Sequence, residues 1–422
     1  MIDCLLHTPE GVRDFNIKET SKKIELQNRI GSVFHRYGFR DIQTPTFEYY
    51  DVFNHERGTV DIREMYKFFD RDGNILALRP DITPSIARYV STYYKNEENP
   101  LRVCYVGNTF RNGKSYQGKL REFTQAGVEL IGINSEDADA EIIALIINSL
   151  SIAGLEKFQI DLGQAGFFKG LAEEAGLDAN EEEELRNFVD EKNFIAVEEL
   201  LTRCNMSDDL KQVFLDLPKL FGSVEVIEKA RKLTNNEKAI NSLDRLEKVY
   251  EILCDYGVEN YVSFDLGLVN CLNYYTGIIF RGYTYGTGVS IVDGGRYDTL
   301  LKQFGKDVPA MGFAIVIDEL MLAIERQQIS LPEFNIDTLI VYNQQTRKQA
   351  IMISEEFRSK GMNVQIGLLE KSLEDNIEYG KKHGIGGIMS FNNNEEVVLV
   401  NLQTMDKTVV AINELLDRGE KA

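Results

Sequence analysis

The feature that most constrains the fold of this chain is an alternating run, REFTQAGVE, at positions 121–129. Successive side chains of a β-strand point to opposite faces of a sheet, so Arg121, Gln125 and Glu129 share one face. Charged and amide groups are costly to bury without partners. The run therefore predicts a strand whose polar face meets either water or a ligand.

The segments around this strand indicate a domain that mixes helices and strands. Residues 17–37 place apolar side chains at helical spacing, and Gly38 follows where a helix often ends. An extended run with an internal proline, Pro45, comes next and is typical of an edge or interface strand. The other elements expected in this half are a strand entering a helix at 75–84 with Thr83 as its N-cap, strands at 102–110 and 119–132, and a helix at 136–155.

The rest of the chain falls into parts of different character. From about 166 to 258, strand patterns give way to acidic helical stretches, which predicts a helical insertion. Sheet character resumes at 261–298 and continues into a further helix. A polar, proline-containing linker is expected at 326–336. Alternating strands and helices at 337–422 predict a small α/β domain that ends in a helix.

Composition limits the class of function. The net charge of −20 argues against a chain whose main task is to grip a phosphate backbone. The five cysteines are odd in number and far apart, which indicates reduced thiols in a cytoplasmic protein. No signal peptide and no membrane span are expected from the apolar pattern. The four histidines are scattered, so no metal site is expected.

Several segments resemble the signature motifs of histidyl-tRNA synthetases, which are class II aminoacyl-tRNA synthetases. Residues 110–132 resemble motif 2, and the first helix with its proline-containing strand resembles motif 1, the dimer-forming element. The segment LRPDITP, which contains Asp81, resembles one histidine-specific signature, and LVNCLNYYTGIIFRGY at 268–283 resembles the second. The resemblance implies an α+β fold: a class II synthetase-like antiparallel sheet core over 1–325, with a C-terminal α/β domain in the place of an anticodon-binding domain.

The chain departs from this family at positions that handle ATP. The second signature of the synthetases carries an arginine and an aspartate where this chain has Asn270 and Asn273. Motif 3 likewise carries a glycine and an arginine where this chain has Val316 and Glu319. A neutral amide at Asn270 cannot replace a guanidinium that faces an anionic transition state. Glu319 stands where the family's arginine stacks on adenine, so it inverts the charge where ATP would lie. The resemblance therefore implies a chain that does not form an adenylate itself and needs no cofactor.

The residues that match the histidine-reading group of the family remain. An imidazole has two ring nitrogens that need partners, which Glu129 and Tyr275 could provide. Arg111 is the candidate for the carboxylate of a bound amino acid, and DGGRYD at 293–298 is interpreted mostly as a structural turn. The candidate histidine-binding residues are Asp81, Thr83, Arg111, Gln125, Glu129, Tyr274 and Tyr275, with Arg121 as a candidate anion-binding residue.

A synthetase-like chain without these arginines resembles the regulatory subunits of ATP phosphoribosyltransferase. That resemblance implies a non-catalytic chain that forms self-dimers and activates a short catalytic subunit in a hetero-octamer of four plus four chains. The complex would carry out the first step of histidine biosynthesis, with L-histidine as feedback inhibitor bound to this chain. Two alternatives stay open: a divergent histidyl-tRNA synthetase, and a stand-alone histidine or tRNA sensor. The acidic balance of residues 331–422 argues against binding of tRNA.

Overall fold

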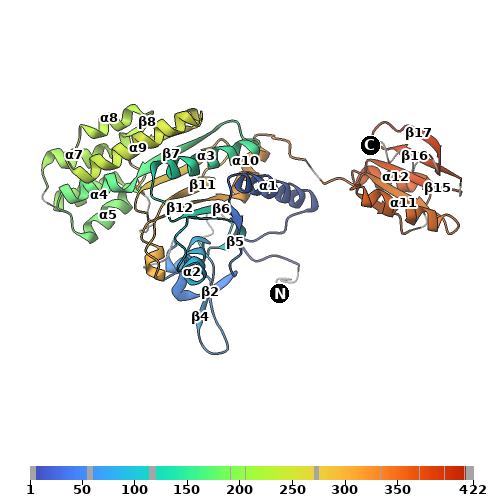
Figure 1. Cartoon of the computed structure of the whole chain (residues 1–422), viewed down its shortest axis with the longest axis horizontal. Helices are drawn as coiled ribbons and strands as arrows, with labels where there is room; N and C mark the ends of the chain where they lie inside the picture. The colour runs from blue at the N-terminus through green and yellow to red at the C-terminus, as the bar shows by residue number, and fades with distance from the viewer. Residues whose placement is uncertain are drawn as a thin grey trace. The chain divides into compact units, whose positions relative to one another are not determined.

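The computed structural model describes residues 6–54, 60–113, 120–190, 192–204, 206–269, 275–332, 334–369, 371–393, 395–412 and 414. The chain, coloured along its length in Figure 1, divides into two compact units, Met1–Leu331 and Pro332–Ala422. The limits expected from the sequence, 1–325, 326–336 and 337–422, are finer than this division and stay a prediction.

A nine-stranded sheet forms the centre of the first unit. β1 pairs with β5 and β7 with β9 in parallel, whereas the other neighbouring strands described in this sheet are antiparallel. The predicted antiparallel core is therefore confirmed. In sheet order the strands are β1 (Arg40–Asp41), β5 (Leu101–Phe110), β6 (Glu122–Ile131), β12 (Ala310–Val316), β11 (Val292–Arg296), β10 (Ile278–Thr284), β7 (Phe158–Gln164), β9 (Val262–Asp265) and β8 (Phe221–Gly222).

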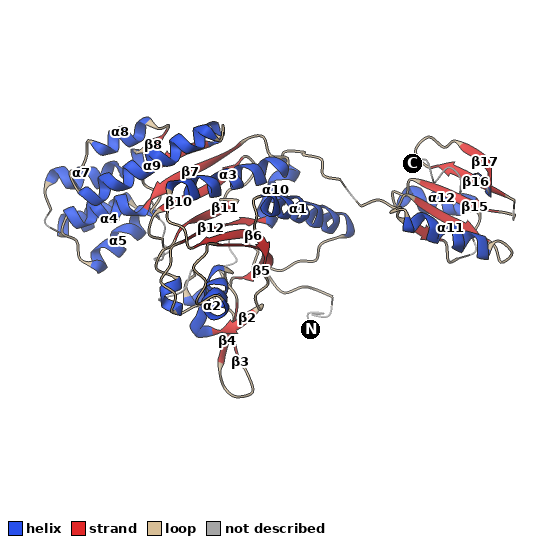
Figure 2. Ribbon diagram, viewed as in Figure 1, coloured by secondary structure: helices blue, strands red, loops and turns tan. Residues whose placement is uncertain are grey.

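Helices α1, α3 and α10 lie together along one face of this sheet (Figure 2). α1 begins with a capping box, in which the side chains of Asn16 and Glu19 each accept a hydrogen bond from the other residue's backbone. Its apolar stripe is buried, and Phe34 meets Phe313 of β12 edge-on, with 5.7 Å between ring centroids. The helix predicted at 17–37 is thus confirmed. The bounds are α1 (Ile17–Arg36), α3 (Glu136–Ile152) and α10 (Ile317–Arg326).

A three-stranded sheet in the order β2-β4-β3 precedes helix α2. The single extended run expected around Pro45 is wrong, because the chain leaves the large sheet after Asp41 and enters the small one at Phe47. The buried Arg79 accounts for this path, since its Nη1 donates to the carbonyl oxygens of Thr44 at 2.9 Å and Pro45 at 3.4 Å. The bounds are β2 (Phe47–Tyr49), β3 (Lys67–Phe69), β4 (Ile75–Leu78) and α2 (Thr83–Tyr93).

The predicted helical insertion is present as a group of helices at the β7 side of the large sheet (Figure 1). One short strand, β8, also lies in this region, where the sequence indicated none. A strand of two residues, which exists by pairing with β9, is too short to produce an alternating pattern. The helices are α4 (Ala165–Glu174), α5 (Ala179–Asp190), α6 (Phe194–Arg203), α7 (Asp208–Asp216), α8 (Glu225–Arg231) and α9 (Glu237–Asp255).

The second unit is the predicted small α/β domain. Its sheet has the order β14-β13-β15-β16-β17, with β13 parallel to β14 and β15 and the remaining pairs antiparallel. Strand β17 was not expected, and most of the closing helix expected after it falls outside the described residues. The bounds are β13 (Thr338–Tyr342), α11 (Arg347–Ser359), β14 (Val364–Ile366), α12 (Leu373–Lys382), β15 (Gly387–Phe391), β16 (Glu396–Asn401) and β17 (Lys407–Ala411).

Candidate functional site

Strand β6 carries the alternating run and lies inside the sheet, between β5 and β12. Gln125 and Glu129 are only 5% and 1% exposed, so the water-facing alternative is wrong for these two residues. Arg121 precedes the strand and stays partly exposed, with 3.8 Å between its Nη2 and Oε2 of Glu10. The buried part of the polar row therefore begins after Arg121.

The carboxyl group of Glu129 is held by two hydroxyl groups. Thr83 Oγ1 donates to Oε1 at 2.7 Å, and the Tyr297 hydroxyl donates to Oε2. The neighbouring strand leaves room for this carboxyl group only because residue 312 is glycine: a Cβ atom there would lie 1.8 Å from Oε2. Burial raises the pKa of Glu129 to about 8, against the opposing effect of the two hydroxyl bonds. The carboxyl group therefore keeps its proton through much of the neutral range.

The first turn of α2 brings two more of the predicted residues to Glu129. Asp81 is buried, and its Oδ1 accepts a hydrogen bond from the backbone N–H of Ile82 at 2.7 Å. Thr83 was expected to cap this helix, but the N-cap position is Ile82 and no side chain caps it. The threonine hydroxyl is directed to Glu129 instead.

Two tyrosines that the sequence reasoning missed complete the site. Tyr105 is buried beside Gly127, where a Cβ atom would lie 2.5 Å from its hydroxyl. Burial raises its pKa well above the ordinary value, and the charges of Glu129 and Asp81 act in the same direction. Tyr297 lies in DGGRYD, whose interpretation as mostly a structural turn is wrong: its first residues form part of β11, and Tyr297 bonds Glu129. The sequence signal that could have identified Tyr297 is a phenol placed two residues after a pair of glycines.

Tyr275 is buried among these groups, and its role in histidine binding stays a prediction. A Cβ atom at Gly295 would lie 2.9 Å from its ring, and Tyr275 packs in the same buried cluster as Tyr105 and Tyr297. The seven residues are called the Glu129 cluster from here on. They are Asp81, Thr83, Tyr105, Gln125, Glu129, Tyr275 and Tyr297. The predicted Tyr274, together with Asn270 and Asn273, lies outside the described residues.

The cluster contains a buried polar atom without a partner in the described part of the chain. Among the residues that the structure describes, no hydrogen-bond partner meets the buried Oε1 atom of Gln125. Buried acceptors are nearly always paired in native proteins, so this atom indicates a missing donor. Arg111 lies next to the turn that precedes α2, because its Nε donates to the Pro80 carbonyl oxygen at 3.1 Å. Its guanidinium lies over the Phe123 ring. A ligand with N–H groups fits such a site.

The described groups that could together hold a metal ion lie outside the Glu129 cluster. Within the described part of the chain, the His, Cys, Asp and Glu groups close enough to share an ion are His35, Asp41 and Cys104. Asp41 is already hydrogen-bonded to His35 at 2.8 Å and accepts from the Cys104 thiol at 3.6 Å. The trio is therefore accounted for by an ion pair beside a buried thiol. Of the helices that the structure describes, none combines the length and the apolarity of a membrane span.

Comparison with known proteins identifies the class. A family model for histidyl-tRNA synthetases matches residues 11–320. The histidyl-tRNA synthetase of Nostoc sp. PCC 7120 has the same fold, with a TM-score of 0.82 over 99% of both chains at 23% identity. The fold is therefore that of a histidyl-tRNA synthetase-like, class II protein.

Closer relatives define the branch. The ATP phosphoribosyltransferase regulatory subunit of Acetivibrio thermocellus is 45% identical over 99% of this chain and 100% of its own length. That of Ruminiclostridium cellulolyticum is 40% identical over 98% of each. A solved structure from Bacillus halodurans, described as an ATP phosphoribosyltransferase regulatory subunit/histidyl-tRNA synthetase, matches with a TM-score of 0.80 and 34% identity over 89% of this chain and 96% of its own. The chain belongs to the family of ATP phosphoribosyltransferase regulatory subunits.

Proposed function

We propose that this chain is a non-catalytic regulatory subunit that binds histidine in the Glu129 cluster and controls ATP phosphoribosyltransferase, the first step of histidine biosynthesis. The observation that carries the proposal is the buried carboxyl group of Glu129, ringed by hydroxyl groups, four residues from the unpaired Oε1 atom of Gln125. Family membership supports the regulatory role. Histidine is the chemical match because it carries N–H donors at both ends.

The two ends of histidine need different partners. The imidazole nitrogens would bond the Glu129 carboxyl group and the Tyr275 hydroxyl, a pairing of an acid with a phenol that discriminates strongly against other side chains. The α-ammonium group would meet Asp81 and the unpaired Gln125 oxygen, both of them buried. Arg111 would meet the carboxylate. Both imidazole nitrogens, the carboxylate and two of the three ammonium N–H donors then have a partner.

The same chain lacks the groups for adenylate formation. Glu319 lies in the first turn of α10, directly after β12, where the synthetases carry an arginine. A carboxylate there reverses the charge at the position where the synthetase arginine stacks on adenine. Val316 at the end of β12 and Asn270 are further departures, although Asn270 lies outside the described residues. The proposed role is therefore regulatory and not enzymatic.

Calorimetry with two matched variants tests the histidine site. Glu129→Gln keeps the side-chain volume and removes the carboxyl group that could ionise against a bound imidazole, and Glu122→Gln makes the same carboxyl-to-amide change on the same strand outside the cluster. Loss of one hydrogen bond to a charged partner costs ~1.5–3 kcal/mol, so the first variant should weaken histidine binding by roughly 10-fold to 150-fold. The second variant should bind as the wild type does. Equal affinity of Glu129→Gln and the wild type contradicts the site assignment.

Pyrophosphate exchange and reconstitution test the rest of the proposal. Exchange with histidine and ATP should stay at background, and robust exchange would establish the divergent synthetase instead. Mixing with a short catalytic subunit should raise phosphoribosyltransferase activity and give a hetero-octamer of four plus four chains by native mass spectrometry. Histidine inhibits only if it binds the inhibited assembly more tightly than the active one. Absence of any complex favours a stand-alone sensor.

A further inference from the structure

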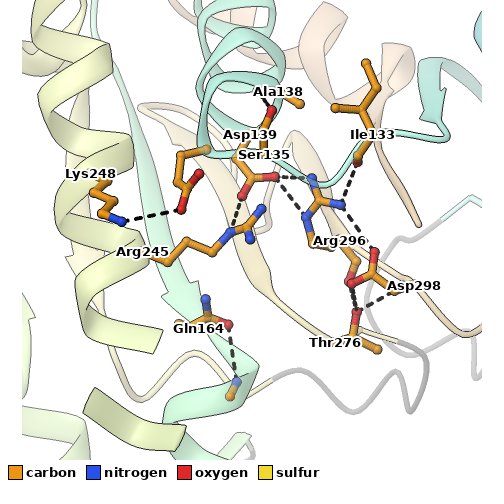
Figure 3. Close-up of polar contacts among 12 residues, drawn as sticks. Ile133, Ser135, Ala138, Asp139, Gln164, Arg245, Lys248, Thr276, Arg296 and Asp298 are labelled. Carbon is orange, nitrogen blue, oxygen red and sulfur yellow. Dashed lines mark hydrogen bonds and ion pairs between the residues drawn. The ribbon is translucent and has the colours of Figure 1, made fainter. Parts of the chain in front are cut away.

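A buried aspartate joins the sheet to the helical insertion. Asp139 in the first turn of α3 is fully buried, and its Oδ1 atom accepts from Nε of Arg296 at 3.0 Å and from Nη2 of the same guanidinium. Its Oδ2 atom accepts from Nε of Arg245 at 2.7 Å. Figure 3 shows Asp139 between these two arginines. The three residues are called the Asp139 clasp from here on.

The clasp is covalently adjacent to the Glu129 cluster. Arg296 is followed by Tyr297, whose hydroxyl bonds Glu129, and then by Asp298, which returns to the clasp by a 3.2 Å contact with Nη1 of Arg296. The Arg296 carbonyl oxygen also accepts from the N–H of Thr276, next to Tyr275 in the chain. Consecutive residues of one segment therefore serve two sites. A displacement of the backbone at Arg296 would carry Tyr297 with it.

The three members of the clasp differ in how easily they can leave it. The side chains of Asp139 and Arg296 are 0% and 2% exposed, whereas that of Arg245 is 21% exposed. Arg245 comes from α9 and borders an open cleft of about 550 Å³, which Thr276 and Asp298 also line. Releasing either buried member would leave a buried charge without its partner, which is strongly unfavourable. Arg245 can withdraw into the water of the cleft instead.

We propose that the Asp139 clasp positions Tyr297 against Glu129, and that Arg245 makes this position depend on the helical insertion. The inference rests on the proposed histidine site and adds a control to it. When α9 shifts and withdraws Arg245, Arg296 becomes the only cation on Asp139 and is drawn toward the vacated oxygen. The segment that carries Tyr297 then moves together with Arg296. Histidine affinity and the position of the insertion are then linked, in both directions.

Arg245→Gln tests the coupling, and Arg231→Gln is its matched control. Arg231 also belongs to the insertion and pairs with two acids of α9, Asp244 and Glu247, without touching the clasp. We expect Arg245→Gln to weaken histidine binding by about 5-fold or more, the range of measured couplings between sites, with little change for the control. Arg245→Lys, which keeps the charge, should recover much of the affinity. Equal effects of both glutamine variants overturn the proposal.

A double-mutant cycle separates positioning from a general loss of stability. In a Tyr297→Phe background, Arg245→Gln should have no further effect on histidine affinity, because its influence passes through the missing hydroxyl. Additive losses overturn the proposal. The carboxyl carbon of Glu129, followed by NMR through a pH titration, provides a readout that needs no histidine. The Tyr297 hydroxyl bond lowers the pKa of Glu129, so Arg245→Gln should raise it and Arg231→Gln should not. If the wild type binds no histidine, the proposed function fails while this titration still decides the clasp.

Discussion

Replacing Glu129 by glutamine should make the stability of this protein less sensitive to pH. Burial raises the pKa of the Glu129 carboxyl group in the folded chain from 4.5 to about 8. Glutamine has nearly the same shape and keeps one of the two oxygens that accept from Thr83 and Tyr297, but it does not titrate. The substitution therefore removes the titration with little change in packing.

The direction of the pH dependence of stability follows from whether the folded or the unfolded chain holds the proton on Glu129. Below about pH 4.5 both the folded and the unfolded chain carry the proton, so the group contributes no pH dependence. Between pH 4.5 and about 8 the unfolded chain loses the proton and the folded chain keeps it, so the free energy of unfolding falls as pH rises. A pKa difference of this size amounts to ~5 kcal/mol in total above pH 8. Relative to the wild type, Glu129→Gln should gain stability over that interval.

Urea unfolding between pH 5 and pH 9 measures the effect. The wild type should lose stability relative to Glu129→Gln as pH rises, by several kcal/mol, whereas Glu122→Gln should track the wild type. Histidine must be absent, because a ligand of the folded state would mask the difference. A constant offset between the wild type and Glu129→Gln across this range would refute the argument that Glu129 is buried with its proton.

Three other predictions concern packing and reactivity. Gly312→Ala would place a methyl group 1.8 Å from the cluster's carboxyl oxygen, so it should abolish histidine binding in calorimetry, whereas Gly288→Ala, in open space, should not. Lys306→Met removes the bonds by which Nζ holds backbone carbonyl oxygens at the end of α2, and urea unfolding should show a loss of ~1–3 kcal/mol; an unchanged midpoint contradicts this. Burial raises the pKa of the Cys104 thiol to about 12. Iodoacetamide at pH 8, followed by mass spectrometry, should therefore alkylate Cys104 far more slowly than the exposed Cys254. Equal rates for the two thiols would contradict the burial of Cys104.

Local pattern was sufficient for much of the fold. The stripe of α1, the strands on either side of the 111–121 segment and the alternation of the C-terminal unit were all predicted from spacing, because helix and strand periods are properties of neighbouring residues. The path around Pro45 was not, since the Arg79 guanidinium that holds the carbonyl oxygens there is more than thirty residues away in sequence. Strand β8 is short and exists only through its pairing with β9.

The sequence by itself determined that Gln125 and Glu129 share one face of a strand and that a first-turn threonine follows Asp81. Only the tertiary structure decided that this face is buried and that Tyr297 belongs to the site. It also decided that the Thr83 hydroxyl donates to Glu129 and does not cap its own helix. Thr83 and Tyr297 lie 46 and 168 positions from Glu129, and no local period records such separations. The pKa of Glu129 follows from the same burial, because removal of water is a property of the packed fold and not of any segment of it.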